Sequence, residues 1–168
     1  IVISSGVVTT LAGSGSLGST DGTGAAAKFY WPSGITTDGT NLYVADGGND
    51  KIRKIVIATG AVTTLAGSGS EGSTDGTGTS ARFKEPQGIT TDGTNLYVAD
   101  LGNHKIRKIV IATGAVTTLA GSGSQGYADG TGTSAKFNQP IKITKDGTNL
   151  YVGDRMNHMI RKIVISSG

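Results

Sequence analysis

The 168-residue sequence contains no cysteine, only three prolines and few aromatic side chains. Without cysteine the chain has no disulfide framework, no thiolate metal site and no cysteine nucleophile. No apolar run approaches the roughly 18 residues that a membrane-spanning helix needs, and no signal peptide is visible. No helical period of apolar residues appears either. We therefore expect an all-β protein with no membrane partner.

The charge of the chain gives little indication of a partner. The net charge is +3, and the basic residues recur evenly in a repeated segment instead of forming a basic tail. This is weak support for a polyanion, so nucleic acid is not expected as a partner. The lack of cysteine leaves the compartment open, because extracellular bacterial proteins often lack it too, and we slightly favour a secreted or cell-surface bacterial origin. Because the sequence begins with Ile1 and not with Met, we expect a processed product or a cut fragment.

A repeat of 54 residues dominates what is present. Leu11, Leu65 and Leu119 follow one another at this interval, and three phenylalanines keep the same spacing. The copies span 7–60, 61–114 and 115–168, so we treat 1–168 as a single repeat domain. Residues 1–6 duplicate 163–168 letter for letter. A period of this length predicts a solenoid, a propeller or an array.

Each copy divides into four expected strands, described here for the middle copy. Short runs rich in β-branched and aromatic residues span 88–91, 96–99, 105–111 and 115–120. Turn residues such as Asp-Gly separate them, which predicts a meander of antiparallel strands. The Gly- and Ser-rich stretch 67–82 keeps its length in every copy, so we expect an ordered surface loop there.

Three motifs of the middle copy then resemble a known family. Pro86-Gln87-Gly88-Ile89, Leu96-Tyr97-Val98-Ala99-Asp100 and Asn103-His104-Lys105-Ile106-Arg107 together resemble an NHL repeat, with partners at 32–53 and 140–161. The third copy departs from the pattern at Lys142, and the first copy departs at Asp50. The resemblance implies a six-bladed β-propeller, so three four-stranded blades would form half of a ring.

The two ends of the chain predict self-association. Residues 7–12 match a fourth strand, whereas 143–165 match the first three strands of a blade. One chain could thus complete the split blade of another, which predicts a homodimer closed into six blades. Only one of the duplicated hexapeptides 1–6 and 163–168 can fill the third-strand position at each junction. The expected self-association residues are Val7, Val8, Leu11, Ile160, Ile163 and Ile165.

The positions that vary between copies predict a ligand face. They fall in the loops after the second and fourth strands, which emerge on one face of a meander. An aromatic side chain such as Trp31 suits a glycan or protein ligand, although packing on the loop of the neighbouring blade is the more ordinary explanation. The candidate ligand-binding residues are Tyr30, Trp31, Lys84, Glu85, Leu101, His104, Arg155, Met156 and His158.

Catalysis is not expected, and neither a cofactor nor a metal is assigned. His104 and His158 are the only histidines and lack close partners for a triad. We expect His104, Asn103 and Asp100 to bridge the second and third strands of their own blade by side-chain hydrogen bonds. Asp21, Asp75 and Asp129 are expected in Asx turns, with calcium binding as the alternative. The leading prediction is a non-enzymatic binding and assembly module. The alternative is a degenerate lyase- or hydrolase-like propeller with an axial metal.

Overall fold

The computed structural model describes residues 5–165 and confirms an all-β fold. Two sheets have five strands, in the orders β1-β5-β4-β3-β2 and β6-β10-β9-β8-β7, and a third sheet has the order β11-β12-β13. The first sheet comprises β1 (Gly22–Thr23), β2 (Pro32–Thr37), β3 (Asn41–Asp46), β4 (Lys51–Val56) and β5 (Ala61–Ala66). The second comprises β6 (Gly76–Thr77), β7 (Pro86–Thr91), β8 (Asn95–Asp100), β9 (Lys105–Val110) and β10 (Ala115–Ala120). The third comprises β11 (Pro140–Asp146), β12 (Asn149–Asp154) and β13 (Met159–Val164).

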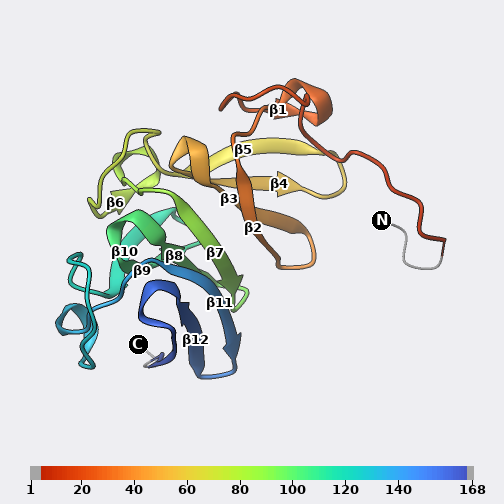
Figure 1. The fold of residues 1–168 in the computed structure, drawn as a ribbon. Coiled ribbons are helices and arrows are strands. Elements are labelled where there is room, and N and C mark those ends of the chain that lie inside the picture. The colour runs from red at the N-terminus through yellow and green to blue at the C-terminus, as the bar shows by residue number, and fades with distance from the viewer. Residues whose placement is uncertain (1–4, 166–168) are drawn as a thin grey trace.

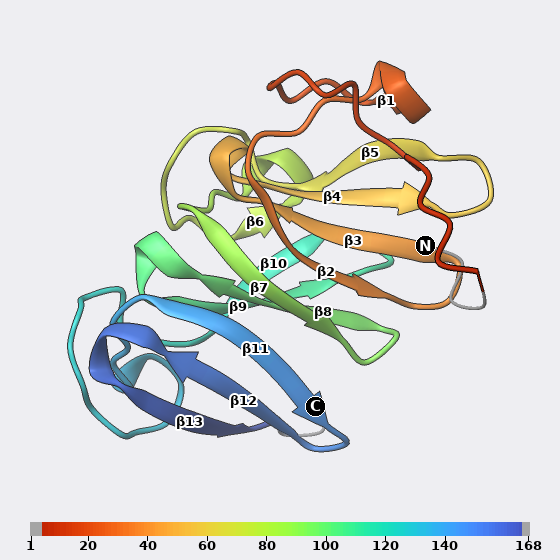
Figure 2. The same cartoon turned by 45° about the vertical axis from the view of Figure 1, so that its right-hand side comes forward.

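The three sheets fan out from their first long strands. β2 contacts β7, and β7 contacts β11, so these strands lie at the inner edge of the fan (Figures 1 and 2). Within each sheet the long strands pair antiparallel in sequence order outward from that edge. The radial stacking of meanders is the arrangement of a β-propeller.

The predicted strands exist, with bounds shifted by one or two residues. The expected strand 88–91 begins earlier, at Pro86, while 115–120 agrees with β10. Each fourth strand belongs in sequence to the following copy, so a complete sheet crosses a repeat boundary. The duplicated hexapeptides 1–6 and 163–168 lie largely outside the described residues.

The loop 67–82 is ordered, as expected, and it adds a strand that the sequence did not predict. β6 pairs with the outer edge of β10, and the one-turn 3-10 helix η3 (Gly78–Ser80) follows it. β1 and η1 (Gly24–Ala26) repeat this arrangement beside β5. The loop therefore closes the outer edge of a complete sheet.

The hydrophobic core lies between neighbouring sheets. Tyr43 and Ile52 of the first sheet share a buried cluster with Leu96 of the second sheet and with Phe83, which precedes β7. A second cluster joins the second and third sheets around Phe137. Each sheet is thus stabilised by burying its faces against the next one.

A buried arginine connects the outer loop to the sheet behind it. The Arg107 guanidinium pairs with Asp100 at 2.8 Å and with Asp75 at 2.7 Å, and it donates to the Arg82 and Thr74 carbonyl oxygens. It also lies over the Phe83 ring, 5.1 Å from the centroid. Arg53 and Arg161 make the corresponding contacts in the other copies.

The constant Asp-Gly-Thr-Asn turn has a carboxylate at its centre. Asp92 Oδ1 accepts hydrogen bonds from the backbone N–H groups of Thr94 and Asn95 at 2.8 and 2.6 Å. Its Oδ2 accepts the Tyr97 hydroxyl at 2.8 Å. This network explains why the four turn residues do not vary between copies.

The third sheet has an open outer edge among residues 5–165. No strand lies outside β13, although β5 and β10 lie outside its equivalents β4 and β9. Residues 7–12, which we expect to complete a sheet of another copy, form no strand in the single chain: Ala12 packs against the first sheet, and the residues before it leave the body (Figure 1). A strand needs a neighbour to satisfy its backbone groups, and β13 lies at the other end of the fan.

The inner strands approach most closely at two glycines. A Cβ atom on Gly34 would stand 2.2 Å from the Gln87 carbonyl oxygen, and one on Gly88 would stand 2.7 Å from that of Ile141. The third copy carries Lys142 at this position, opposite Gly153. Within the described chain no inner strand packs on the far side of Lys142.

No helix of the described residues is long and apolar enough to cross a membrane.

Replacing Arg107 by Lys should lower the free energy of unfolding by about 3–5 kcal/mol, because a single ammonium leaves buried acceptors unpaired. Urea unfolding at fixed protein concentration measures this change. Lys108→Gln, next along β9 and facing the other side, is the control and should change stability by less than about 0.5 kcal/mol. Equal effects of the two substitutions would contradict the structural role of Arg107.

Stability should fall as the pH drops from about 3.8 towards 2. Burial raises the pKa of Asp92, but hydrogen bonds from Asn95, Thr94 and Tyr97 outweigh it and lower the pKa to about 2. A folded-state pKa below the ordinary value contributes stability above that value and loses it in acid. Urea unfolding between pH 7 and 2.5 should show a shallower acid loss in Asp92→Asn. An unchanged pH slope in this variant would count against the turn network.

Candidate functional site

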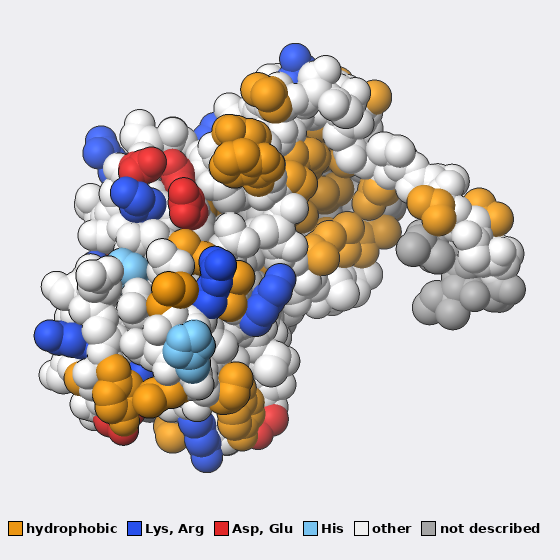
Figure 3. Space-filling model, in the orientation of Figure 1, with side chains coloured by type: hydrophobic (Ala, Val, Ile, Leu, Met, Phe, Trp, Pro, Cys, Tyr) orange, Lys and Arg blue, Asp and Glu red, His pale blue; other side chains and the backbone are white. Residues whose placement is uncertain are grey.

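A basin opens at one end of the inner strands. It encloses about 400 Å³. The residues just before and within the first strands β2, β7 and β11 line it, together with the turns that follow the second strands β3, β8 and β12. Its lining residues are Trp31, Gly47, Glu85, Gln87, Leu101, Gln139, Ile141 and Arg155. The two loop sets predicted to share a face therefore do meet. In Figure 3 basic and hydrophobic side chains lie side by side on the visible face.

The backbone of the basin is the same in all three copies although its side chains differ. Trp31, Glu85 and Gln139 each precede a proline and adopt a positive φ of 51°, 49° and 56°. Such left-handed conformations are uncommon outside glycine and accumulate at functional positions. Backbone hydrogen bonds from Gly47 to Trp31 and from Arg155 to Gln139 hold these corners. The backbone thus fixes the positions from which the side chains enter the basin, while the residue types at these positions differ between copies.

His104 connects neighbouring sheets, so the prediction that it bridges strands of its own sheet is wrong. Its Nδ1 accepts the Gln139 backbone N–H at 3.1 Å, and the Asp50 carboxylate accepts the Glu85 N–H in the preceding junction. Burial lowers the pKa of His104, partly opposed by Asp154, which favours the neutral, accepting imidazole. Asn103 donates to Asp100 at 2.8 Å within the turn after β8. Asp100 connects β8 to β9 through Arg107, at 2.8 Å.

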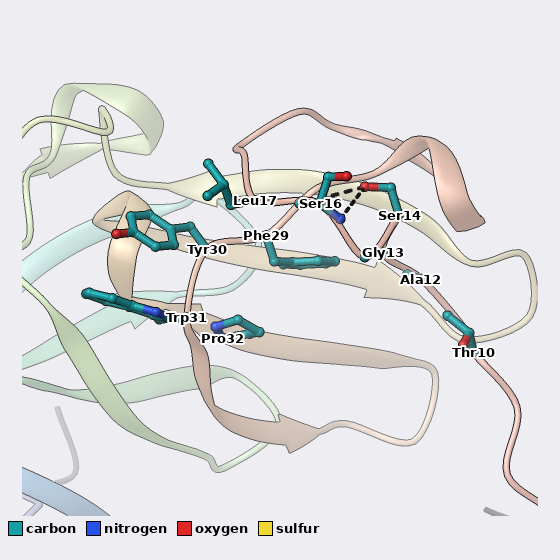
Figure 4. A pocket seen from close by; sticks show the side chains of 11 residues that line it. Thr10, Ala12, Gly13, Ser14, Ser16, Leu17, Phe29, Tyr30, Trp31 and Pro32 are labelled. Atoms are coloured by element: carbon teal, nitrogen blue, oxygen red, sulfur yellow. Dashed lines mark hydrogen bonds between the residues drawn. The ribbon is translucent and has the colours of Figure 1, made fainter.

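Trp31 is the most prominent side chain of the basin. It is 70% exposed, and its ring lies 4.5 Å from that of Tyr30 at a tilt of 38°. Tyr30 faces a second hollow beside the N-terminal segment, which Phe29, Pro32 and Ser14 also line (Figure 4). An exposed aromatic pair between two hollows is a surface on which a planar or apolar ligand group can stack.

Four predicted ligand residues lie outside the basin lining, besides Tyr30. Lys84 pairs with Glu71 at 2.8 Å on the surface. His104 accepts a backbone hydrogen bond between the second and third sheets. Met156 and His158 are exposed in and after the last 3-10 turn, η6 (Arg155–Asn157). The basin instead includes Gln87, Gln139 and Ile141, which the sequence marked only as variable positions. Their variability at a fixed backbone was the available signal.

The prediction of Asx turns at the three loop aspartates is also wrong. Asp75 pairs with Arg107 and accepts the Thr118 backbone N–H at 3.1 Å, across the sheet from its own loop. Asp21 makes the same contacts with Arg53 and Thr64. The role of the arginine was missed because its segment was considered only for its contribution to the net charge. The available signal was that the arginine and the two aspartates are present in every copy. Residues 5–165 contain no group of three or more His, Asp or Glu side chains arranged to hold a metal ion.

The predicted self-association residues lie at the two ends of the fan. Val7, Val8 and Leu11 are exposed on the N-terminal segment. Ile160 on β13 is 77% exposed, whereas its equivalents Ile52 and Ile106 are fully buried. Ile163 and Ile165 pack partly against the core between the second and third sheets. Hydrophobic side chains also gather where the N-terminal segment leaves the body (Figure 3).

Comparison with known proteins identifies sequence relatives. The NHL repeat-containing protein 2 of Bos taurus is 36% identical over an alignment of 151 residues, with 80% of this chain and 21% of that protein covered. The protein SUPPRESSOR OF QUENCHING 1, chloroplastic, of Arabidopsis thaliana is 36% identical over 155 residues, or 84% and 14% of the two chains. The chain thus spans a small part of these relatives. No family model matches the sequence.

Solved structures share the fold. An auxiliary nutrient binding protein from Bacteroides thetaiotaomicron aligns with a TM-score of 0.68 and 28% identity, over 76% of this chain and 36% of that one. A virginiamycin B lyase from Staphylococcus aureus aligns with a TM-score of 0.51 and 18% identity, over 87% and 45%, which shows the fold alone. Together with the repeat motifs and the fanned sheets, these relatives place the chain in the NHL-repeat β-propeller family.

Proposed function

We propose that this chain is a non-enzymatic propeller module that associates with itself through its open sheet edges and binds a ligand in the basin. In this proposal two copies form a ring of six blades, and a glycan or a protein segment is the ligand. The open edge of β13 is the observation that supports self-association, and the basin around Trp31 is the observation that supports ligand binding.

The open edge supports assembly because it exposes groups that are buried elsewhere in the same chain. Ile160 is exposed where Ile106 is buried, and the unpaired backbone of β13 offers hydrogen-bonding groups to another strand. At the other end of the fan, Ile35 is 60% exposed while its equivalent Ile89 is 6% exposed. Both ends therefore present the kind of surface that neighbouring sheets cover inside the chain.

The basin supports ligand binding by its chemistry. Trp31 offers an aromatic face, while Glu85, Gln139 and Arg155 offer a carboxylate, an amide and a guanidinium around the same space. Apolar walls with a few converging polar groups are typical of ligand sites. The Bacteroides protein named an auxiliary nutrient binding protein, at 28% identity, agrees with a binding role. The enzyme alternative predicts a stoichiometric bound metal, which metal analysis of the purified protein would reveal.

The purified chain should have a native mass of twice 16.9 kDa. We expect this dimer at micromolar concentration because exposed strand edges and apolar faces at both ends favour association. Light scattering after size exclusion measures the mass. A monomer at these concentrations would refute self-association, and a ladder of larger species would replace the closed ring by an open polymer.

Replacing Trp31 by Ala should weaken binding of a glycan or peptide ligand at least about tenfold, since the stacking surface is lost. The ligand is first found by screening a glycan array and a peptide library with the unmodified chain, and affinity is then measured by calorimetry. Trp31→Phe should retain most of the affinity, and Met156→Ala, exposed outside the basin lining, should leave it unchanged. Equal loss in Met156→Ala would place the ligand elsewhere.

A further inference from the structure

We infer that residues 7–12 of a second copy insert as the fourth strand of the third sheet, between β13 and the loop 129–132. The inference rests on the self-association proposed above and identifies the contact that makes it. The partner is a second copy of this chain, and the occupant of the edge is a defined six-residue segment.

A groove already exists at this position. It holds about 500 Å³ between β13 and the loop, and its lining includes the apolar side chains of Leu119, Phe137 and Ile163. In the complete sheets the fourth strand occupies the same place, since β5 lies between β4 and β1 and β10 lies between β9 and β6. The groove is lined by Leu119, Ala120, Asp129, Gly130, Thr131, Gly132, Ala135, Phe137, Arg161, Lys162, Ile163 and Val164.

The sequence of the occupant matches the strands that fill the two complete sheets. Residues 7–12 read Val-Val-Thr-Thr-Leu-Ala, and both β5 and β10 read Ala-Val-Thr-Thr-Leu-Ala. The segment therefore carries the side chains that this edge accepts elsewhere. Its apolar residues Val7, Val8 and Leu11 are exposed in the single chain.

Residues 7–12 are also placed where they can pair with a sheet of another copy. The Leu11 carbonyl oxygen lies against Gly60 as the Leu65 carbonyl oxygen lies against Gly114, at 2.9 and 3.1 Å from the ideal Cβ positions. The C-terminal end of the segment, at Leu11 and Ala12, thus lies beside its own first sheet, while Val7 and Val8 remain exposed. β13 belongs to the third sheet, at the far end of the fan (Figure 2), so the sheet that receives the segment belongs to another copy.

The receiving side holds a preformed polar partner. Asp75 accepts both the backbone N–H and the hydroxyl of Thr118 at 3.1 Å, while it pairs with Arg107. Asp129 is paired with Arg161 in the same way at 2.7 Å, but its side chain is 78% exposed, against 48% for Asp75. Shifting the numbering by two repeats makes Thr10 the equivalent of Thr118. Thr10 of the second copy would therefore donate to Asp129.

The register follows from the pairing of β9 with β10. Their opposed residues include Ala115 with Val110 and Thr117 with Lys108. Transferred by the 54-residue repeat, the pairs between two copies are Val7 with Val164, Val8 with Ile163, Thr9 with Lys162, Thr10 with Arg161 and Ala12 with Ile160. A slip by one residue would turn the apolar side chains towards solvent.

Disulfide trapping tests this register, and the cysteine-free chain suits it. A chain with Thr9→Cys, mixed with a chain with Lys162→Cys and oxidised mildly, should give a cross-linked heterodimer in high yield. Directly opposed antiparallel residues lie within the Cα distance that a disulfide spans. The control pair Thr10→Cys with Lys162→Cys should cross-link at least about tenfold less, because the two side chains then point to opposite faces.

The outcomes separate this inference from the proposed function. Equal or greater cross-linking of the control pair, or no cross-link in a chain of dimeric mass, would overturn strand donation while self-association stands. A monomeric mass would refute both. Cross-linking of the matched pair alone, in the dimer, supports the inference.

A second comparison tests the polar contact without cysteine. Asp129→Ala should raise the dimer dissociation constant about tenfold, because Thr10 of the second copy loses its acceptor. The matched variant Asp75→Ala removes the same contact inside one chain, so it should lower the stability of the fold instead. An unchanged dissociation constant for Asp129→Ala, in a variant that unfolds like the unmodified chain, would contradict the inferred contact.

Discussion

The buried guanidinium of each copy is the interaction on which the rest of the structure depends. Arg107 and Arg53 are enclosed on all sides, and each joins a sheet strand to an outer loop and to a phenylalanine ring. A buried charge is tolerated only when it is paired and hydrogen-bonded. The loop with its aspartate must therefore close over the sheet whenever the core forms, and this closure defines the place for a fourth strand.

This constraint makes each sheet depend on two copies of the repeat. The first three long strands come from one copy, while the fourth comes from the next. The aspartate that pairs with the arginine also accepts the backbone of that fourth strand, as Asp75 does for Thr118. A single carboxylate thus couples the folding of one sheet to the attachment of the next copy. In the third sheet the equivalent Asp129 pairs with Arg161, but no fourth strand is present among the described residues.

The sequence alone predicted the repeat, the strands and the face on which variable residues gather. These features follow from local rules, namely alternation of apolar residues, turn chemistry at Asp92 and a fixed period. It did not predict the burial of Arg107 or the role of His104, because both depend on groups brought together from distant segments. The two-residue strand β6 has no local signal either, since it exists only beside β10.

The loops that line the basin are those that sequence variation marked, but only some of the predicted side chains lie in its lining. Trp31, Glu85, Leu101 and Arg155 line it, whereas Lys84 is drawn away by Glu71. The positive φ of the residue before each proline decides which of two adjacent variable residues turns inward. Such a backbone conformation cannot be predicted from a tryptophan or a glutamate, which rarely adopt it.

The close approach of the inner strands has a mechanical consequence. Gly34 and Gly88 let neighbouring strands touch backbone to backbone, but Lys142 carries a side chain at the equivalent position. In the proposed ring the junctions between copies would therefore stand wider at the axis than the junctions within a copy. Under load or dilution such a ring would part at those two places first, and each half would separate as an intact unit.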